Sequence, residues 1–433
     1  MRISLRLLLI ALVAACAPMV PDPPGMQRPP SVETRTPEPR PEAAPATSPD
    51  PEPAPADPAP YDDGSFQAWK QGFLARHGGA NRAAFERELE GVTPNPDVIR
   101  LDRNQPEFSR PAGAYIANAV SAGRISEGRQ RTLEVPWEAT ATYGVPAEIL
   151  VSIWAMESGF GSNQGDFDVI RSLATLAYDG RRRDWAEGQL RDALRVVVEG
   201  RRARSGLKGS WAGAMGQTQF MPDNYLRLGV DGNGDGVVDI WGSNADALMS
   251  AAHLLSDAGW KRGQGWAREV VLPPGFDYSL AEGAKHPWSF WAARGVALTP
   301  GDHLNQAERA EDAAILLPQG ARGPAFLALP NHYVIRRYNN SAAYALAVGL
   351  MADGVMGKPG LTRAWPDDAP LSRDQRLGAQ RALQALGYDP GGIDGIIGSG
   401  TRAALRNWQI ANGETPDGYL SAGLADRLIA LAQ

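Results

Sequence analysis

The sequence predicts a mostly α-helical protein. Apolar residues recur at helical spacing, as in 85–89, 149–156 and 245–255. Glycine and proline separate these segments, whereas alternating runs of β-branched residues are rare between Phe66 and Val355. This punctuation is typical of many helices joined by short connections. We therefore expect helices through residues 65–356 and again through residues 371–433.

The composition narrows the class of protein. A chain of 433 residues suggests two or three domains. The net charge of −6 argues against a protein that coats nucleic acid. None of the five histidines pair at metal-site spacing, which argues against a zinc hydrolase, and a single cysteine excludes an intrachain disulfide. We expect neither a nucleic-acid partner nor an organic cofactor.

The N-terminus has the pattern of a secretory signal. Arg2 and Arg6 precede the apolar run LLLIALVAA, which is too short for a stable transmembrane span. Cys16 follows directly, and V-A-A-C resembles a bacterial lipobox. The resemblance implies a lipoprotein signal peptide and lipidation site over 1–16, with a membrane attachment through Cys16. Ala17 stands where an inner-membrane retention signal usually has Asp, which favours the outer membrane of a Gram-negative bacterium.

Two proline-rich segments divide the rest of the chain. Residues 17–62 hold 16 of the 35 prolines and few large apolar side chains. This composition predicts an extended, semi-rigid tether over 17–64. A second break rich in proline and glycine predicts a linker over 357–370. These boundaries leave one domain over 65–356 and a smaller one over 371–433.

The segment YGVPAEILVSIWAMESGFG, residues 143–161, carries the most informative acid. Pro146 suits the first turn of a helix, and Gly159 can end it. Ile149, Ile153 and Glu157 are four residues apart, so they share one face of that helix. Burial and the negative helix end both disfavour the charged form, so we expect a raised pKa for Glu157. A raised pKa is what a general acid needs at neutral pH.

Three motifs carry a family resemblance. A-M-E-S-G-F-G around Glu157 resembles the catalytic helix end of lytic transglycosylases and goose-type lysozymes. GSWAGAMGQTQFMP (209–222) and RRYNNSAAYALA (336–347) resemble two segments of the membrane-bound lytic transglycosylase B family. The motifs occur in the family's order and cover about 145–350. The resemblance implies a lysozyme-like, goose-type-like catalytic domain, with Glu157 as its catalytic residue and with Ser210, Gln219, Tyr338 and Tyr344 in its active site.

The sequence departs from the family at one place. Where relatives often have a tyrosine after the calcium loop, this chain has Leu254, preceded by His253. One aromatic wall of the cleft is therefore expected to be missing.

The resemblance also implies the reaction. Protonated Glu157 would cleave the β-1,4 bond between N-acetylmuramic acid and N-acetylglucosamine in peptidoglycan. It would then act as the base that closes a 1,6-anhydromuramyl end. A hydrolytic muramidase is the nearest alternative and needs a second carboxylate, for which Asp166 and Asp168 are candidates, with Asp179 and Asp223. A non-catalytic wall-binding lipoprotein is the third hypothesis.

The segment VDGNGDGVVDIWGSNAD, residues 230–246, predicts a structural calcium site. Asp231, Asn233 and Asp235 follow the start of an EF-hand loop, in which Val237 would supply its backbone carbonyl. Position twelve is glycine rather than glutamate, and the family resemblance implies Asp246 as the acidic ligand instead. The alternative is a turn rich in Asp and Asn that binds no metal.

The last segment, 371–433, resembles the three-helix peptidoglycan-binding domain of wall hydrolases. Its signature is D-G-x-x-G-x-x-T-x-x-A-L, which begins at Asp394. A second contact with the wall would raise the local concentration of substrate. The sequence as a whole therefore predicts a periplasmic, lipid-anchored lytic transglycosylase with peptidoglycan glycan strands as its partner.

Overall fold

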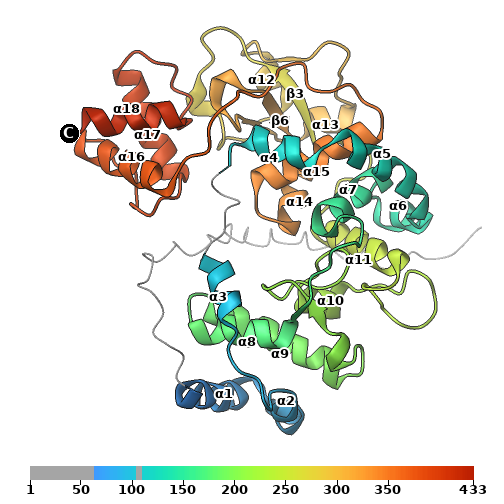
Figure 1. Cartoon of the computed structure of the whole chain (residues 1–433). Helices are drawn as coiled ribbons and strands as arrows, with labels where there is room; N and C mark the ends of the chain where they lie inside the picture. Colours follow the sequence, from blue (N-terminus) through green and yellow to red (C-terminus); the bar gives the residue numbers. More distant parts are fainter. Residues whose placement is uncertain (1–62, 104–109) are drawn as a thin grey trace, which may run out of the picture. The chain divides into compact units, whose positions relative to one another are not determined.

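The computed structural model describes residues 63–103 and 110–433. These residues fold mostly into α-helices, which confirms the predicted fold class (Figure 1). The predicted signal peptide, Cys16 and residues 17–62 of the tether lie outside the described residues. The first helix, α1 (Asp63–His77), begins two residues before the expected domain start. Within the described ranges, no helix is long and apolar enough to cross a bilayer.

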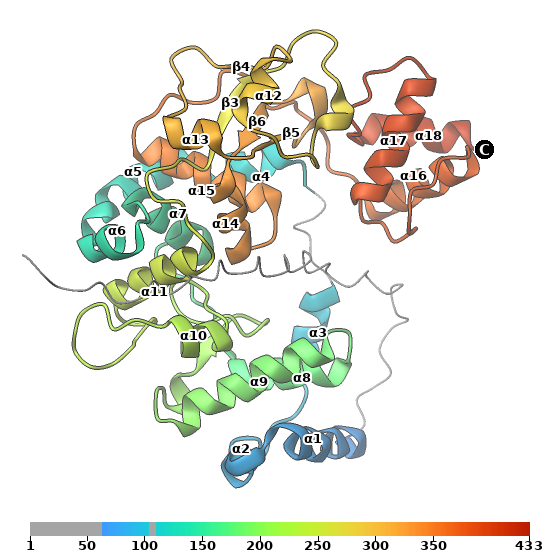
Figure 2. The ribbon, with the colours of Figure 1, turned by 180° about the vertical axis from the view of Figure 1, so that it is seen from behind.

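The N-terminal part of the domain packs against a pair of helices. α8 (Val169–Asp179) and α9 (Arg183–Val198) lie side by side in both views (Figures 1 and 2). The buried carboxylate of Glu187 on α9 accepts hydrogen bonds from Trp69 (3.1 Å) and Arg76 (2.7 Å), which fastens α1 to the pair. The other helices before α7 are η1 (Gly79–Asn81), α2 (Arg82–Glu88), α3 (Pro96–Arg103), α4 (Ala112–Ala119), α5 (Ala122–Arg131), η3 (Thr132–Glu134) and α6 (Trp137–Tyr143).

The helix that bears Glu157 runs through the main core. α7 (Ala147–Ser158) has Gly159 as its C-cap, as the sequence predicts, and Pro146 is its N-cap, just before the first turn in which it was expected. Eight of its twelve residues are buried, because it packs against α5 on one side and α15 (Ala342–Val355) on another. α11 (Asn244–Asp257) also contacts it. The remaining helices of the core are α10 (Pro222–Leu228) and α14 (Pro330–Tyr338).

An antiparallel sheet lies within the region that the sequence analysis expects to be helical. Its strand order is β4-β3-β6-β5 (Figure 2), and it has its own core around Trp291 and Leu327. Its strands span two to five residues, and β6 is buried at every position, so no alternating pattern marks it in the sequence. The elements are β3 (Ala267–Val271), η5 (Tyr278–Leu280), α12 (Trp288–Ala292), β4 (Ala297–Leu298), α13 (Gln306–Ala310), β5 (Ala314–Leu316), η6 (Gly320–Arg322) and β6 (Ala325–Ala328).

A second, two-stranded sheet leads into the loop that contains the second motif. β1 (Phe167–Asp168) pairs antiparallel with β2 (Lys208–Gly209), which follows η4 (Arg204–Gly206). Bridges from Gly209 to Met215 and from Met215 to Phe220 then fold the loop back on itself. The result is a compact turn beside the end of α7.

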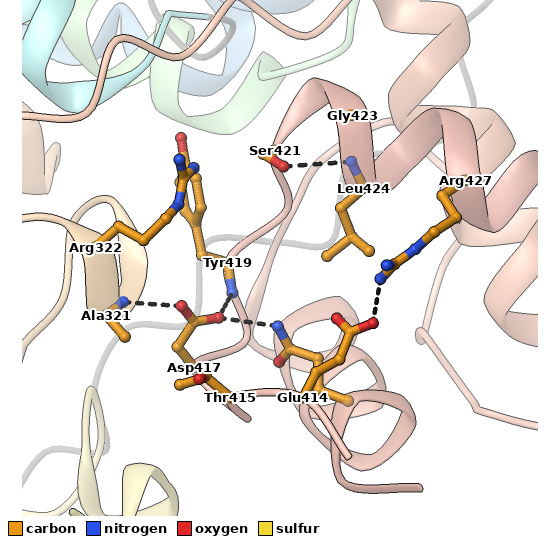
Figure 3. Close-up of a pocket in the computed structure, with 11 residues that line it drawn as sticks. Ala321, Arg322, Glu414, Thr415, Asp417, Tyr419, Ser421, Gly423, Leu424 and Arg427 are labelled. Atoms are coloured by element: carbon orange, nitrogen blue, oxygen red, sulfur yellow. Dashed lines mark hydrogen bonds and ion pairs between the residues drawn. The ribbon is translucent and has the colours of Figure 1, made fainter. Parts of the chain in front are cut away.

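The C-terminal segment forms a three-helix module with a core of its own. Leu383 on α16 (Arg373–Ala385), Trp408 on α17 (Ser399–Ala411) and Leu428 on α18 (Ala422–Leu431) are buried in it. Asp417 accepts a 2.8 Å hydrogen bond from the backbone of Ala321 in η6, beside a pocket of about 390 Å³ (Figure 3).

Candidate active site

Glu157 lies one residue before the end of α7, and its side chain is half-buried. The helix ends there because Gly159 takes the left-handed conformation, with φ of +57°. Tyr344 on α15 donates a 2.5 Å hydrogen bond from its hydroxyl to Oε1 of Glu157. The third motif is thus brought against the first.

The two tyrosines of the third motif, Tyr338 and Tyr344, both donate hydrogen bonds within the site. Burial raises the pKa of the Tyr344 phenol well above its usual range, and the nearby Glu157 carboxylate raises it further. Burial also raises the pKa of Tyr338, whose hydroxyl donates a 2.6 Å hydrogen bond to the backbone oxygen of Thr218. Both phenols therefore stay protonated, and each fixes one segment of the site to another.

Ser210 and Gln219 lie in the loop of the second motif. Ser210 Oγ accepts a 3.1 Å hydrogen bond from the backbone of Ala214, which closes a tight turn. Gln219 has a left-handed backbone, with φ of +50°, and its Nε2 donates to the carbonyl oxygens of Gln164 (3.1 Å) and Gly216 (2.9 Å). In the part of the chain that the structure describes, neither side chain is hydrogen-bonded to Glu157.

The loop also brings in residues that the sequence analysis did not single out. Gln217 is buried, with 3% of its surface exposed, and contacts both Trp154 and Ser158 of α7. Asn244, the first residue of α11, accepts a hydrogen bond from the side chain of Gln217. Gln217 lies inside the second motif, but sequence spacing does not show which of its polar side chains turn inward.

The carboxylates considered for a hydrolytic mechanism are mostly engaged elsewhere. Asp168 caps α8 and accepts a 2.7 Å hydrogen bond from Arg204. Asp179 is paired with Arg103 at 3.0 Å. Asp166 is exposed, and Asp223 accepts a hydrogen bond from the adjacent backbone of Asn224. No hydrogen bond or ion pair among the described residues joins any of the four to Glu157.

Leu254 is buried in the main core, with 8% of its surface exposed. The residue before it, His253, stacks on Tyr143 with ring centroids 5.0 Å apart and contacts the carbonyl oxygen of Leu228. Leu254 therefore contributes to the core, and His253 makes an aromatic contact with Tyr143.

The acidic loop after α10 is organised by its own backbone. Asp231 accepts hydrogen bonds from Gly234, Asp235 and Gly236, and Asn233 Nδ2 donates to Asp235. This arrangement places the oxygens of Asp231, Asn233 and Asp235 on one turn, which suits a hard cation.

Asp246 fits a ligand role less well. It is fully buried, and its carboxylate accepts hydrogen bonds from the backbones of Gly232, Asn233 and Asp239 and from Ser243 Oγ. In the ranges described, no group of three or more His, Cys, Asp or Glu side chains is placed to hold a metal ion.

A half-buried glutamate at the end of a core helix, in a mostly helical domain followed by a three-helix module, is the architecture of a lytic transglycosylase. Comparison with known proteins identifies the family. Residues 65–353 match the family described as "Transglycosylase SLT domain", and residues 372–428 match "Putative peptidoglycan binding domain". The first match covers more than half of the chain, so the chain belongs to this transglycosylase family and is an enzyme.

Individual relatives agree with this assignment. The membrane-bound lytic murein transglycosylase B of Escherichia coli K12 is 30% identical over 293 residues, which are 64% of this chain and 79% of that protein. The structure of SltB3 from Pseudomonas aeruginosa in complex with NAG-anhNAM-pentapeptide is 48% identical, with a TM-score of 0.79, and covers 84% of this chain and 99% of that one. The E. coli transglycosylase Slt35 in complex with calcium is 30% identical, with a TM-score of 0.56, and covers 67% of this chain and 92% of that one.

Proposed function

We propose that this transglycosylase cleaves the β-1,4 bond between N-acetylmuramic acid and N-acetylglucosamine in peptidoglycan, with Glu157 as its single acid and base. The observation that supports this role is the position of Glu157, which lies in the last turn of a buried helix and accepts a 2.5 Å hydrogen bond from the Tyr344 hydroxyl. Similarity to SltB3, whose structure is in complex with NAG-anhNAM-pentapeptide, supports the choice of substrate.

The reaction balances without water. Protonated Glu157 donates its proton to the glycosidic oxygen, and the bond from that oxygen to C1 of the muramic acid breaks. The 2-acetamido group stabilises the cation that develops at C1. Glu157, now a carboxylate, takes the proton of the 6-hydroxyl group, whose oxygen bonds to C1. One residue thus serves twice and is returned protonated.

We assign Ser210, Gln219 and Tyr338 to substrate binding. All three lie in or against the loop 209–222, and the loop is fixed by its own bridges. A rigid loop with hydroxyl and amide groups suits a glycan, which presents hydroxyl and N-acetyl groups. Hydrolysis by a muramidase has less support, because Asp168 and Asp179 are paired with arginines.

Mass spectrometry of the products tests the function. The enzyme is incubated with purified peptidoglycan beside the variant Glu157→Gln, which keeps the size of the side chain. We expect muropeptides one water lighter than ordinary ones, and none from the variant. Ordinary reducing ends would instead indicate a muramidase. Wall binding without soluble products from the unaltered enzyme would indicate a binding lipoprotein.

We further propose a structural calcium ion in the loop 230–246, held by Asp231, Asn233, Asp235 and the Val237 carbonyl. The shared turn of the three side chains supports it, as does the calcium complex of the similar Slt35. Asp246 would have to share its oxygens with the four hydrogen bonds that it already accepts. The ion would stiffen the loop between α10 and α11.

We propose that this protein is a periplasmic enzyme and that a lipid on Cys16 anchors it to the outer membrane. The lipobox-like sequence V-A-A-C supports the anchor, and the membrane-bound E. coli relative supports a location at a membrane. The module at 371–433 would supply a second contact with peptidoglycan. Labelling with a radioactive fatty acid tests the anchor, because Cys16→Ser should abolish the label.

A further inference from the structure

The turn after Glu157 is strained. Gly159, Phe160 and Gly161 all have positive φ, at +57°, +58° and +84°. A left-handed backbone is ordinary for glycine but costs free energy for a bulky residue such as Phe160. Such strain persists only where the surrounding structure imposes it, and it is frequent at active sites.

The ring of Phe160 is held from two sides. It packs edge-on against Trp154 of α7, with centroids 5.7 Å apart and planes at 84°. The guanidinium of Arg131, at the end of α5, lies 5.1 Å from the centres of both rings. Only 6% of the Phe160 surface is exposed. These contacts therefore hold Phe160 in place, the residue of the turn whose backbone conformation costs the most free energy.

Gln217 holds the same turn from the opposite side. Its backbone oxygen accepts a 2.5 Å hydrogen bond from Ser158 Oγ, which itself accepts one from the backbone of Gly161 at 2.8 Å. A Cβ atom on Gly161 would lie 2.5 Å from Gln217 Oε1, so the turn is packed directly on this amide. Gln217 thus contacts the residues on both sides of the strained Phe160.

The contacts of Gln217 close into a ring. Trp154 Nε1 donates to Gln217 Oε1 at 3.0 Å, and Gln217 Nε2 donates to Asn244 Oδ1 at 2.9 Å. Asn244 Nδ2 donates to Glu134 at 2.6 Å. Glu134 in turn accepts from Arg131 at 3.3 Å, and Arg131 lies over Trp154. The five side chains come from α5, η3, α7, the loop 209–222 and α11, so they tie these segments to the last turn of α7.

We propose that Gln217 is a positioning residue, whose side chain acts through Trp154 and the turn at Gly161 to fix the carboxyl group of Glu157 against the sugar. This inference rests on the proposed role of Glu157. Because the amide uses both its oxygen and its nitrogen in the ring, an apolar side chain of similar size opens the ring at two points. The hydrogen bond from Tyr344 to Glu157 does not involve this ring, so it would remain in such a variant.

The test is Gln217→Leu, compared with the unaltered enzyme on a soluble glycan of alternating N-acetylglucosamine and N-acetylmuramic acid. We expect kcat to fall about 10- to 100-fold, the loss typical of a displaced catalytic group, while KM changes less than threefold. Gln217→Glu keeps the oxygen that accepts from Trp154 and should recover part of kcat. Hydrogen exchange at residues 159–161 should become faster in Gln217→Leu.

Gln319→Leu is the matched control. Gln319 is also buried, and its side chain makes hydrogen bonds with Gly113, Pro366 and Asp368, away from the turn. If both variants lose stability but only Gln217→Leu loses kcat, the effect is one of positioning. Equal kcat values for the two variants would overturn the proposal.

A further variant separates this proposal from the assignment of Glu157. Asn244→Leu opens the same ring, so the double variant with Gln217→Leu should be about as slow as either single variant. Additive losses would contradict a shared ring. If Glu157→Gln remains active, the assignment of the acid itself fails, and the positioning role fails with it. An inactive Glu157→Gln beside a fully active Gln217→Leu would overturn the positioning role alone.

Discussion

The Tyr344 hydroxyl donates a 2.5 Å hydrogen bond to Oε1 of Glu157, a residue 187 positions earlier in the chain. The bond joins the ends of two core helices, since Glu157 lies in the last turn of α7 and Tyr344 lies in the first turn of α15. The raised pKa of the phenol keeps its proton on the tyrosine side. Tyr344 is therefore a fixed donor to Glu157, and in the proposed mechanism it keeps this bond while the proton of Glu157 moves to and from the sugar.

Removal of this donor should slow the reaction. A hydrogen bond to a charged group contributes about 1.5–3 kcal/mol, so Tyr344→Phe should lower kcat by roughly 10- to 100-fold. Initial rates of release of anhydro products measure the change. Tyr225→Phe is the control, because Tyr225 is equally buried and donates to the backbone of Val238 outside the site. Equal rates for the two variants would show that the bond to Glu157 does not assist catalysis.

His332 should make the fold sensitive to acid. Burial lowers the pKa of this histidine from 6.5 to about 3, and neither ring nitrogen has a hydrogen-bonding partner in the described residues. Below pH 6.5 the unfolded chain therefore takes up a proton that the folded protein does not. The free energy of unfolding falls by up to about 1.4 kcal/mol per pH unit from pH 6.5 towards pH 3.

Urea unfolding at pH 7 and pH 4 checks this dependence. His332→Phe keeps an aromatic ring beside Trp266 and Tyr333, and its free energy of unfolding should fall less between the two pH values. The control is His303→Gln at an exposed position, whose free energy of unfolding should depend on pH as it does in the unaltered protein. An identical loss in His332→Phe would mean that other groups cause the acid sensitivity.

Sequence patterns predicted the parts of this fold that local chemistry determines. Pro146 and Gly159 mark the ends of α7 as the structure has them, and the apolar spacing marks α11. The sheet was not predicted, because its strands are short and β6 is buried on both faces. The ring around Gln217 was not predicted either. Its members come from five segments, and only the folded chain brings them together.

The loop 230–246 should respond to calcium. Ligand at about 100-fold above Kd stabilises a protein by about 2.7 kcal/mol, so we expect Tm to rise by roughly 5–10 °C over a sample with chelator. Asp231→Asn removes one charged ligand but keeps the side-chain shape, and it should reduce the rise. The exposed Asp257→Asn is the control, since it lies outside the loop. A Tm that calcium and chelator leave unchanged would favour a metal-free turn.

Glu282 should hold the C-terminal module in place. Its backbone is left-handed, with φ of +64°, and its carboxylate accepts hydrogen bonds from Arg402 at 2.7 and 2.8 Å and from Arg406 at 3.2 Å. All three side chains are largely buried, so loss of the acid leaves two cations without this partner. Segment 357–370 should then open more often, because a docked module restrains it.

Limited proteolysis measures that opening. We expect cleavage within 357–370 to be about tenfold faster in Glu282→Ala, which corresponds to about 1.4 kcal/mol of lost docking free energy. The control is Glu414→Ala, which removes an ion pair with Arg427 inside the module and should leave the rate unchanged. Because the module has its own core around Leu383 and Trp408, the released fragment should keep its helical circular dichroism. Equal cleavage rates for the two variants would mean that other contacts, such as the one from Ala321 to Asp417, are enough to hold the module.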